Sequence, residues 1–248
     1  ITRLNYAKRL FAVPIAVLAQ AAGQASLPFF ARLFGEGRRE DFAATVSRSV
    51  YRVSALGFLA SAWMVAAALP LVDLVYRRGR FQFSDSATTA AYFLWFALSL
   101  GLWAAQALYA RAFYAAGNTV TPMVAGTLVT LASLPVYAWL FRTLDVVGLA
   151  MASDLGILGH TVVLGWLLHR QGLVPLGTLP WTELGKALAT AVAAGAAGGA
   201  VARTVALDGS RAADATVLAL VSVTWAGAAA AGLWLTRSEL PRMWRRRL

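Results

Sequence analysis

The sequence has no cysteine, two histidines and few charged residues. Asp, Glu, Lys and Arg together make up 13% of its 248 residues, against about 25% in ordinary soluble domains. Without cysteine there can be no disulfide, thiol catalysis or Cys-ligated metal, and the redox compartment is not indicated. So few charged side chains cannot cover a soluble globule of this length, and the composition therefore excludes an ordinary soluble domain.

Catalytic motifs are also missing. The sequence contains no H-E-x-x-H, G-x-S-x-G or P-loop pattern, and its carboxylates do not have the spacing of metal ligands. Most enzyme mechanisms would lack the groups they need with two histidines and no cysteine. We therefore expect a protein that is not an enzyme and that has no cofactor and no bound metal.

Long apolar runs dominate what is present. Hydrophobic residues make up 59% of the chain, and the mean hydropathy is +0.64. A helix needs about 20 mostly apolar residues to cross a bilayer, and the runs lack the alternating pattern of barrel strands. The sequence predicts an all-α, polytopic membrane helix bundle of about seven transmembrane helices, at residues 10–30, 53–75, 87–110, 119–141, 146–168, 184–201 and 215–235.

Cations are unevenly distributed between these predicted spans. Six follow the second, fourth and sixth spans, whereas 13 follow the other four: Arg32, Arg38, Arg39, Arg48, Arg52, Arg111, Arg170, Lys186, Arg237, Arg242, Arg245, Arg246 and Arg247. Because Lys and Arg concentrate in cytoplasmic loops, we expect a cytoplasmic C-terminus and an outer start of the first span. The net charge of +11 then reflects topology and anionic membrane lipids, and we expect no nucleic-acid partner.

Two cations precede an early break in the first apolar run. Lys8 and Arg9 stand directly before it, and Pro14 interrupts it. A cation at the mouth of a broken helix can hold a phosphate, but long basic side chains at helix ends also extend to lipid headgroups. The residues alone leave both interpretations of Arg9 open.

Ionisable residues within the runs are few, and each is costly at membrane depth. Asp73 lies near Arg77, which favours an interfacial ion pair. Asp154 lies about 12 Å into the fifth run, at 1.5 Å per residue. It is either a proton or cation site or a carboxylate paired with a neighbouring helix. His160 is on another face of that helix, and we expect it to form a hydrogen bond inside the bundle. Gly195 and the glycine four residues later indicate close helix packing.

Four stretches resemble motifs of the MurJ/MviN family, and they occur in that family's order. Residues 6–14 with 24–28 look like the start of its second lobe. Residues 74–81 with the following Asp85 are similar to its Arg-Gly-x-Phe turn, and residues 148–152 resemble the start of a later helix. Residues 111–122 resemble its Arg-x-Phe-Tyr-x-x-Gly-Asp-x-x-Thr-Pro loop, in which Asn118 replaces the usual Asp.

The resemblance implies a fold and a function. The family is similar to multidrug and oligosaccharidyl-lipid exporters, with two lobes of six helices, two additional helices and alternating access through a cationic cavity. Its members move lipid II, a polyprenyl-pyrophosphate glycolipid used in cell-wall biogenesis, across the bacterial cytoplasmic (inner) membrane. Residues 1–170 would then be the second lobe, and residues 171–248 the two additional helices with a basic cytoplasmic tail. The missing N-terminal lobe would be a necessary partner, so this chain alone should not transport.

Roles of single residues follow from the same resemblance. Arg9 matches the cavity arginine of the second lobe, and with Lys8 it would bind the substrate pyrophosphate. Pro14 and Pro28 match positions that bend the same helix. The cytoplasmic loop motif comprises Arg111, Gly117, Asn118 and Pro122.

Other properties stay open. Asp154 stands where a small residue is usual, and neither a coupling ion nor a use of the membrane potential is indicated. An exporter of another polyprenyl-linked glycan and a non-transporting membrane scaffold are the alternative functions.

Overall fold

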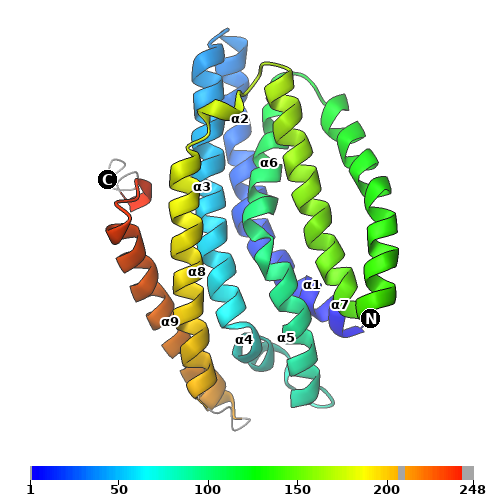
Figure 1. Ribbon diagram of the computed structural model, residues 1–248, viewed down its shortest axis with the longest axis vertical. Coiled ribbons are helices and arrows are strands. Elements are labelled where there is room, and N and C mark those ends of the chain that lie inside the picture. Colours follow the sequence, from blue (N-terminus) through cyan, green and yellow to red (C-terminus); the bar gives the residue numbers. More distant parts are fainter. Residues whose placement is uncertain (1, 206–209, 242–248) are drawn as a thin grey trace. The chain divides into compact units, whose positions relative to one another are not determined.

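The structure is a computed structural model that describes residues 2–205 and 210–241. Its helices are α1 (Thr2–Pro14), α2 (Ala21–Gly35), α3 (Arg39–Ala66), α4 (Ala68–Tyr76), α5 (Phe83–Leu98), α6 (Leu100–Ala115), α7 (Val120–Arg170), α8 (Trp181–Thr204) and α9 (Arg211–Leu235) (Figure 1). A π-helix, η1 (Ile15–Gln20), joins α1 to α2, and a 3₁₀ turn, η2 (Leu176–Thr178), precedes α8. These described residues form no strand, which confirms the predicted all-α class.

Several of these helices are long and apolar enough to cross a membrane. Five continuous stretches qualify, and α5 with α6, bent by 42°, makes a sixth. As one straight helix the 51 residues of α7 would measure about 76 Å, far more than a hydrocarbon core of about 30 Å. Asp145 divides it, with a non-helical φ of 52° and ψ of −138°, and Figure 1 shows the two arms as a hairpin. Counting the two arms of α7 as separate spans raises the number from six to seven. This agrees with the prediction of about seven spans.

The helices extend beyond the apolar runs that predicted them. The second span was expected from residue 53, but α3 begins at Arg39. Several cations assigned to loops therefore lie within helices instead, namely Arg48 and Arg52 in α3, Arg111 in α6 and Lys186 in α8. Glu40 and Asp41 lie in the first turn of α3, where carboxylates interact favourably with the helix dipole, so the polar turns before the apolar run are also helical.

Contacts divide the described chain into two compact units. Unit 1 comprises the described parts of residues 1–12, 58–98 and 185–248, and unit 2 comprises residues 13–57 and 99–184. The division at residue 170, which the family resemblance implies, is a different boundary that these units do not test, and it stays a prediction.

Large apolar side chains form the core of unit 2. Phe30, Phe42, Phe113, Leu164 and Leu168 are fully buried, and they belong to one cluster that joins α2, α3, α6 and α7. Phe42 contacts Phe30 edge to face, with ring centroids 6.1 Å apart. This dense packing fixes the helices that carry the loop motif at residues 111–122.

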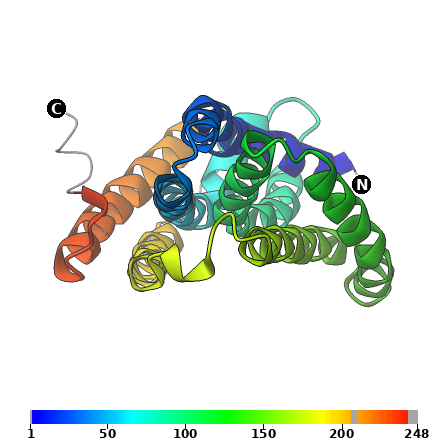
Figure 2. The ribbon, with the colours of Figure 1, turned by 90° about the horizontal axis from the view of Figure 1, so that it is seen from above.

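Small residues allow close helix packing in unit 1, where α8 and α9 are antiparallel (Figure 1) and the view from above shows α9 tilted away from α8 (Figure 2). A Cβ atom at Gly195 would lie 3.1 Å from the Ala62 Cβ of α3, and one at Gly232 of α9 would lie 2.7 Å from Thr190 Cγ2 of α8. Gly195 therefore packs within the chain, as predicted from its spacing. Gly199 differs, because a Cβ added there would meet no atom within 4 Å.

Candidate functional site

Lys8 and Arg9 lie on α1 and are both exposed. Leu4, Ala7 and Phe11 are its buried residues. At 100° per residue, Arg9 is about 200° from Ala7 around the helix, and Lys8 is about 40° from Leu4. Arg9 therefore lies away from these three buried residues, about 60° from Tyr6, whereas Lys8 lies close to Leu4 on the buried side.

The two cations differ in their contacts. The Lys8 Nζ lies 5.8 Å from the Phe96 ring centroid of α5, within range of a cation–π interaction. With the described residues Arg9 forms no ion pair and no hydrogen bond. Its guanidinium is therefore available to a ligand.

An aromatic cluster fixes the start of α1 in unit 1. The Tyr6 ring centroid lies 5.0 Å from that of Tyr76 and 5.4 Å from that of Phe81. The Tyr76 hydroxyl donates to the Tyr6 carbonyl oxygen at 3.1 Å, and Arg3 forms an ion pair with Asp85 of α5. Two of the family-like stretches, residues 6–14 and 74–85, thus contact each other and hold the helix that carries Arg9.

The helix changes type directly after Pro14. Pro14 is the last residue of α1, and the six-residue π-helix η1 follows it. Such π segments are rare and occur often at functional sites. Pro28 lies inside α2, and the helix continues through it. The structure therefore shows a helical irregularity after Pro14, five residues beyond Arg9.

The predicted loop motif is an ordered turn of unit 2. Asn118 Oδ1 accepts a hydrogen bond from the Thr121 backbone N–H at 3.0 Å, and its Nδ2 donates to Gln171 Oε1 at 3.3 Å. Gly117 adopts a φ of 74°, which a glycine permits at low cost, and Pro122 is buried in the first turn of α7. Asn118 thus caps α7 and connects the turn to the far end of the same hairpin.

Arg111 packs against two residues of unit 2. Its guanidinium carbon lies 5.4 Å from the Tyr114 ring centroid, and its Cγ would lie 3.6 Å from a Cβ added to Gly23 of α2. Within the described structure its buried Nε has no hydrogen-bond partner. The Arg111 side chain therefore connects the loop helix α6 with α2.

Asp154 and His160 lie on the second arm of α7. Both carboxylate oxygens of Asp154 are buried without a hydrogen bond among the described residues, and the Ser99 side chain, at the break between α5 and α6, interacts with it. The His160 Nε2 also has no hydrogen bond within this part of the chain. The expected hydrogen bond is thus missing at Nε2, because the imidazole faces Gly126, where an added Cβ would lie 3.3 Å from Cε1.

A buried ion cluster joins three elements of unit 1. The Arg77 guanidinium lies 3.2 Å from Asp73 Oδ2 and 3.8 Å from Asp214 Oδ2 of α9, and the Ser86 hydroxyl of α5 donates to Asp73 Oδ1. The pair of Asp73 with Arg77 confirms the prediction from their spacing. Sequence reasoning missed Asp214 and Ser86, because only the fold brings them to this pair.

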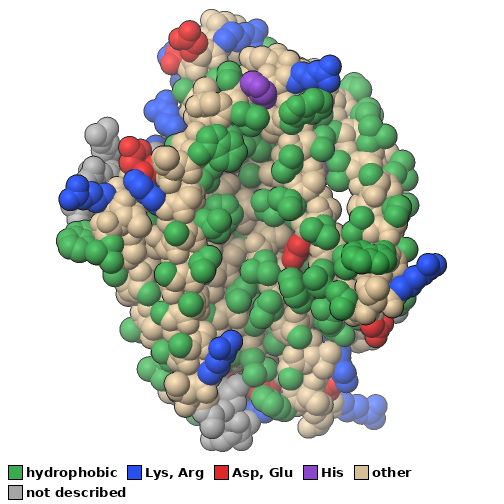
Figure 3. All heavy atoms as spheres, in the orientation of Figure 1, with side chains coloured by type: hydrophobic (Ala, Val, Ile, Leu, Met, Phe, Trp, Pro, Cys, Tyr) green, Lys and Arg blue, Asp and Glu red, His purple; other side chains and the backbone are tan. Residues whose placement is uncertain are grey.

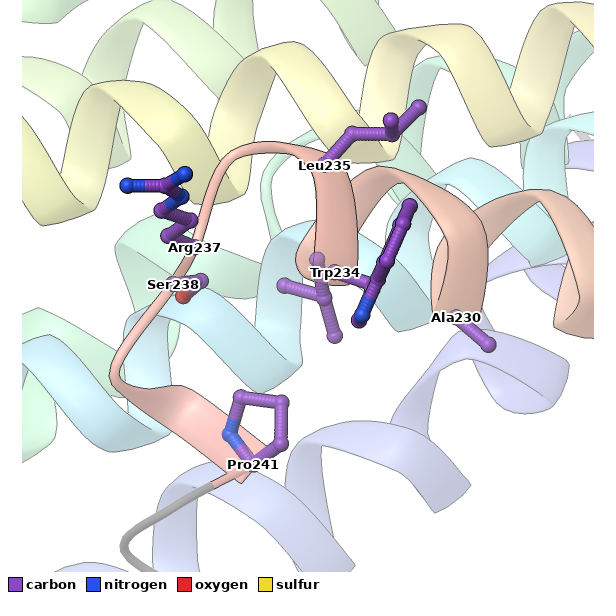
Figure 4. Close-up of a pocket in the computed structure, with 7 residues that line it drawn as sticks. Ala230, Trp234, Leu235, Arg237, Ser238 and Pro241 are labelled. Carbon is purple, nitrogen blue, oxygen red and sulfur yellow. The ribbon is translucent and has the colours of Figure 1, made fainter.

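A pocket of about 880 Å³ lies at the C-terminal end of α9 (Figure 4). Its side chains include Trp234 and Arg237, a pair typical of a membrane interface, and none of the predicted site residues. The described residues hold no group of three His, Cys, Asp or Glu side chains that could bind a metal. The predicted basic tail, with Arg242, Arg245, Arg246 and Arg247, lies outside the described residues.

The surface agrees with a membrane environment. Hydrophobic side chains cover much of the helix faces, whereas most Lys and Arg side chains lie toward helix ends (Figure 3). Large exposed side chains include Val17, Leu128, Trp139 and Val223, each at least 60% exposed. Apolar exposure on this scale suits lipid contact.

Comparisons with known proteins point to one family. The sequence profile described as "Lipid II flippase MurJ" matches residues 1–208. A probable lipid II flippase MurJ of Bdellovibrio bacteriovorus is 26% identical over 170 residues, which are 68% of this chain and 32% of that protein. The corresponding protein of Vibrio cholerae is 26% identical over 200 residues, 79% of this chain and 38% of the relative. The chain thus spans about a third of the length of these curated relatives.

One solved structure is similar in fold. The lipid II flippase MurJ in an inward closed conformation superimposes with a TM-score of 0.73, over 94% of this chain and 47% of that one. At 16% sequence identity, this similarity supports the helical architecture and no residue roles.

Proposed function

The chain belongs to the MurJ family of lipid II flippases, and we propose that it forms the second lobe and two additional helices of such a flippase. Its cargo would be lipid II, moved from the cytoplasmic to the outer leaflet of the bacterial cytoplasmic membrane. The family profile over residues 1–208 supports this proposal, as do curated relatives named as probable lipid II flippases. We propose a cytoplasmic C-terminus, on the basis of the cation distribution.

The observation that carries the proposal is the placement of Arg9. It is exposed on α1, on the side opposite the buried Ala7, and it forms no ion pair or hydrogen bond with the described residues. A guanidinium in this state can form paired hydrogen bonds with phosphate oxygens. Arg9 would therefore bind the pyrophosphate of the cargo, and Lys8 would add charge beside it.

The irregular helix after Pro14 supplies the moving element of the proposal. Alternating access requires two conformations whose populations differ when cargo is bound. A π-helix within an α-helix is rare and often marks a functional site, and η1 would be the place where the segment that carries Arg9 changes its angle. Pro28 would shape the same helix further along.

An ion site at Asp154 is a second part of the proposal. Its buried carboxylate beside the break between α5 and α6 could bind a proton or cation while that break changes its bend. Intramembrane carboxylates often serve such pathways. Because the sequence contains none of the catalytic motifs considered above, we propose that the protein acts in transport and not in catalysis.

Complementation tests the Arg9 role. Full-length protein containing this chain would be produced in cells depleted of their own lipid II flippase, with protein levels in the membrane measured. Loss of a charged hydrogen-bonding partner costs about 1.5–3 kcal/mol, which is about 10- to 100-fold in affinity. We expect Arg9→Ala to lose complementation, Lys8→Ala to weaken it, and the exposed control Arg142→Ala to retain it.

The alternatives predict other results. Rescue by Arg9→Ala equal to that by wild type would exclude the pyrophosphate contact and favour a scaffold. Failure of the wild type itself, at normal membrane levels, would favour another polyprenyl-linked cargo.

A further inference from the structure

An apolar groove of about 800 Å³ runs along α8 in unit 1. Its walls come from the C-terminal part of α3 and from α4, α5 and α8, and all of them belong to this unit. The volume lies within the range of small-molecule sites, about 300–1,000 Å³. Apart from Ser61 and Arg203, every lining residue is apolar.

The groove is long, and many of the side chains that line it are small. Along α8 it extends from Leu188 to Arg203, about 22 Å at 1.5 Å per residue. Gly195 packs on Ala62 and holds α8 close to α3, whereas a Cβ added to Gly199 would meet nothing within 4 Å. Gly199 thus lines an open part of the groove, and its missing side chain keeps the space free.

Two polar groups give the groove a direction. Arg203 lies in the last turn of α8, is exposed, and has no ion pair or hydrogen bond with the described residues. Ser61 is 5% exposed, and its Oγ has no hydrogen-bond partner in this part of the chain. An occupant should therefore have an anionic group at the Arg203 end and a long apolar portion that continues past Ser61.

We propose that this groove holds one anionic phospholipid, with its phosphate at Arg203 and an acyl chain along α8. Two of its helices, α3 and α8, are long and apolar enough to cross a membrane, so we expect lipid chains rather than water around the groove. A single cation at one end favours a headgroup with net negative charge, and a channel of about 22 Å suits an extended chain better than a compact solute. This site is separate from the cargo contact assigned to Arg9 and does not depend on lipid II being the cargo.

Native mass spectrometry of the full-length protein tests the proposal. The purified protein would be incubated with equal amounts of dioleoyl phosphatidylglycerol and dioleoyl phosphatidylcholine, and the retained lipid would be counted. Gly199→Phe fills the groove from α8, and Ala91→Phe fills it from α5. Gly227→Phe is the matched control, because Gly227 is on α9, does not line the groove, and also has nothing within 4 Å of an added Cβ.

We expect wild type and Gly227→Phe to retain one phosphatidylglycerol molecule, and both groove variants to reduce its occupancy at least tenfold. Arg203→Gln should abolish the preference for phosphatidylglycerol over phosphatidylcholine. Thermal unfolding would identify a variant that fails to fold. If one groove variant fails to fold, the lipid occupancy of the other groove variant tests the proposal.

Two results would overturn the proposal. One is equal retention of phosphatidylglycerol by wild type and a folded groove variant. The other is one-for-one displacement of the phospholipid by undecaprenyl phosphate, which would assign the groove to the cargo. Complementation by Gly199→Phe, measured in parallel, separates failure of this lipid site from failure of the proposed transport function.

Discussion

At the scale of single residues, one amide determines how α7 begins. Asn118 accepts the Thr121 N–H and donates to Gln171, so it satisfies a backbone donor that the helix cannot satisfy itself. The related motif has Asp at this position. An Asp carboxylate would also accept the Thr121 N–H, and rotation of the Gln171 amide would let it donate in return. The observed turn is therefore compatible with either residue.

Removing that amide should destabilise unit 2. We expect Asn118→Ala to lower the free energy of unfolding in detergent micelles by about 1 kcal/mol, a typical cost of a lost N-cap. The free energy of unfolding of Asn118→Asp should stay within about 0.5 kcal/mol of wild type. We expect the same of Asn5→Ala, which serves as an exposed control on α1. Chemical denaturation measures all three, and an unchanged Asn118→Ala would exclude the capping role.

Local spacing predicted some partners and not others. Asp73 and Arg77 are four residues apart on a helix, where side chains are neighbours, and the structure confirms their pair. Asp214 is far away in the sequence, and no local pattern connects it to Arg77. The same limit applies to Arg9: its exposure follows from the side of α1 that packs, which the sequence 6–14 alone does not define.

At the scale of helices, the crossing of α3 and α6 depends on two glycines. A Cβ at Gly57 would lie 2.6 Å from the Gly101 Cα, too close for either backbone to remain in place. We expect Gly57→Ala to lower the free energy of unfolding by about 1–3 kcal/mol through overpacking. Gly227→Ala, with no neighbour within 4 Å, should be neutral or stabilising. Chemical denaturation of both variants measures these free energies. An equal free energy of unfolding for the two variants would contradict the close crossing of α3 and α6.

The ion cluster connects α4 with α9 inside unit 1. Arg77 lies beside two buried carboxylates, those of Asp73 and Asp214. Removing one partner of a buried pair costs about 3–5 kcal/mol, because the remaining charge is not compensated. We therefore expect Arg77→Met to lower the free energy of unfolding by about that amount.

A double variant separates charge from packing at this cluster. Adding Asp214→Asn to Arg77→Met removes one of the uncompensated charges and should restore part of the lost stability. Thermal unfolding of the single and double variants provides the comparison. If the double variant were less stable than Arg77→Met, the cluster would contribute through packing rather than charge.

Hydrophobic runs predicted the helices better than their ends or breaks. The gap between residues 141 and 146 anticipated the division of α7 at Asp145. The 42° bend between α5 and α6 lies within one predicted span and has no proline to mark it. Pro135, by contrast, lies in continuous helix. Tertiary packing decides which interruptions become bends, and a single sequence does not contain that information locally.

At the scale of the whole molecule, composition and length were sufficient for the class and the approximate number of spans. The division into two compact units was not foreseen, because it depends on contacts between segments that are distant in the sequence. Orientation is a separate question, which the cation distribution addresses without reference to packing.

Cysteine accessibility gives a direct test of that orientation, because the chain contains no native cysteine. Glu40 and Arg80 are exposed at opposite ends of the segment that contains α3 and α4. With a cytoplasmic C-terminus, residue 80 faces outward and residue 40 faces the cytoplasm. A membrane-impermeant maleimide should therefore label Arg80→Cys in intact cells or spheroplasts, and Glu40→Cys only after permeabilisation. The reverse labelling pattern would invert the topology, and it would place Arg203 and the proposed phospholipid at the cytoplasmic leaflet.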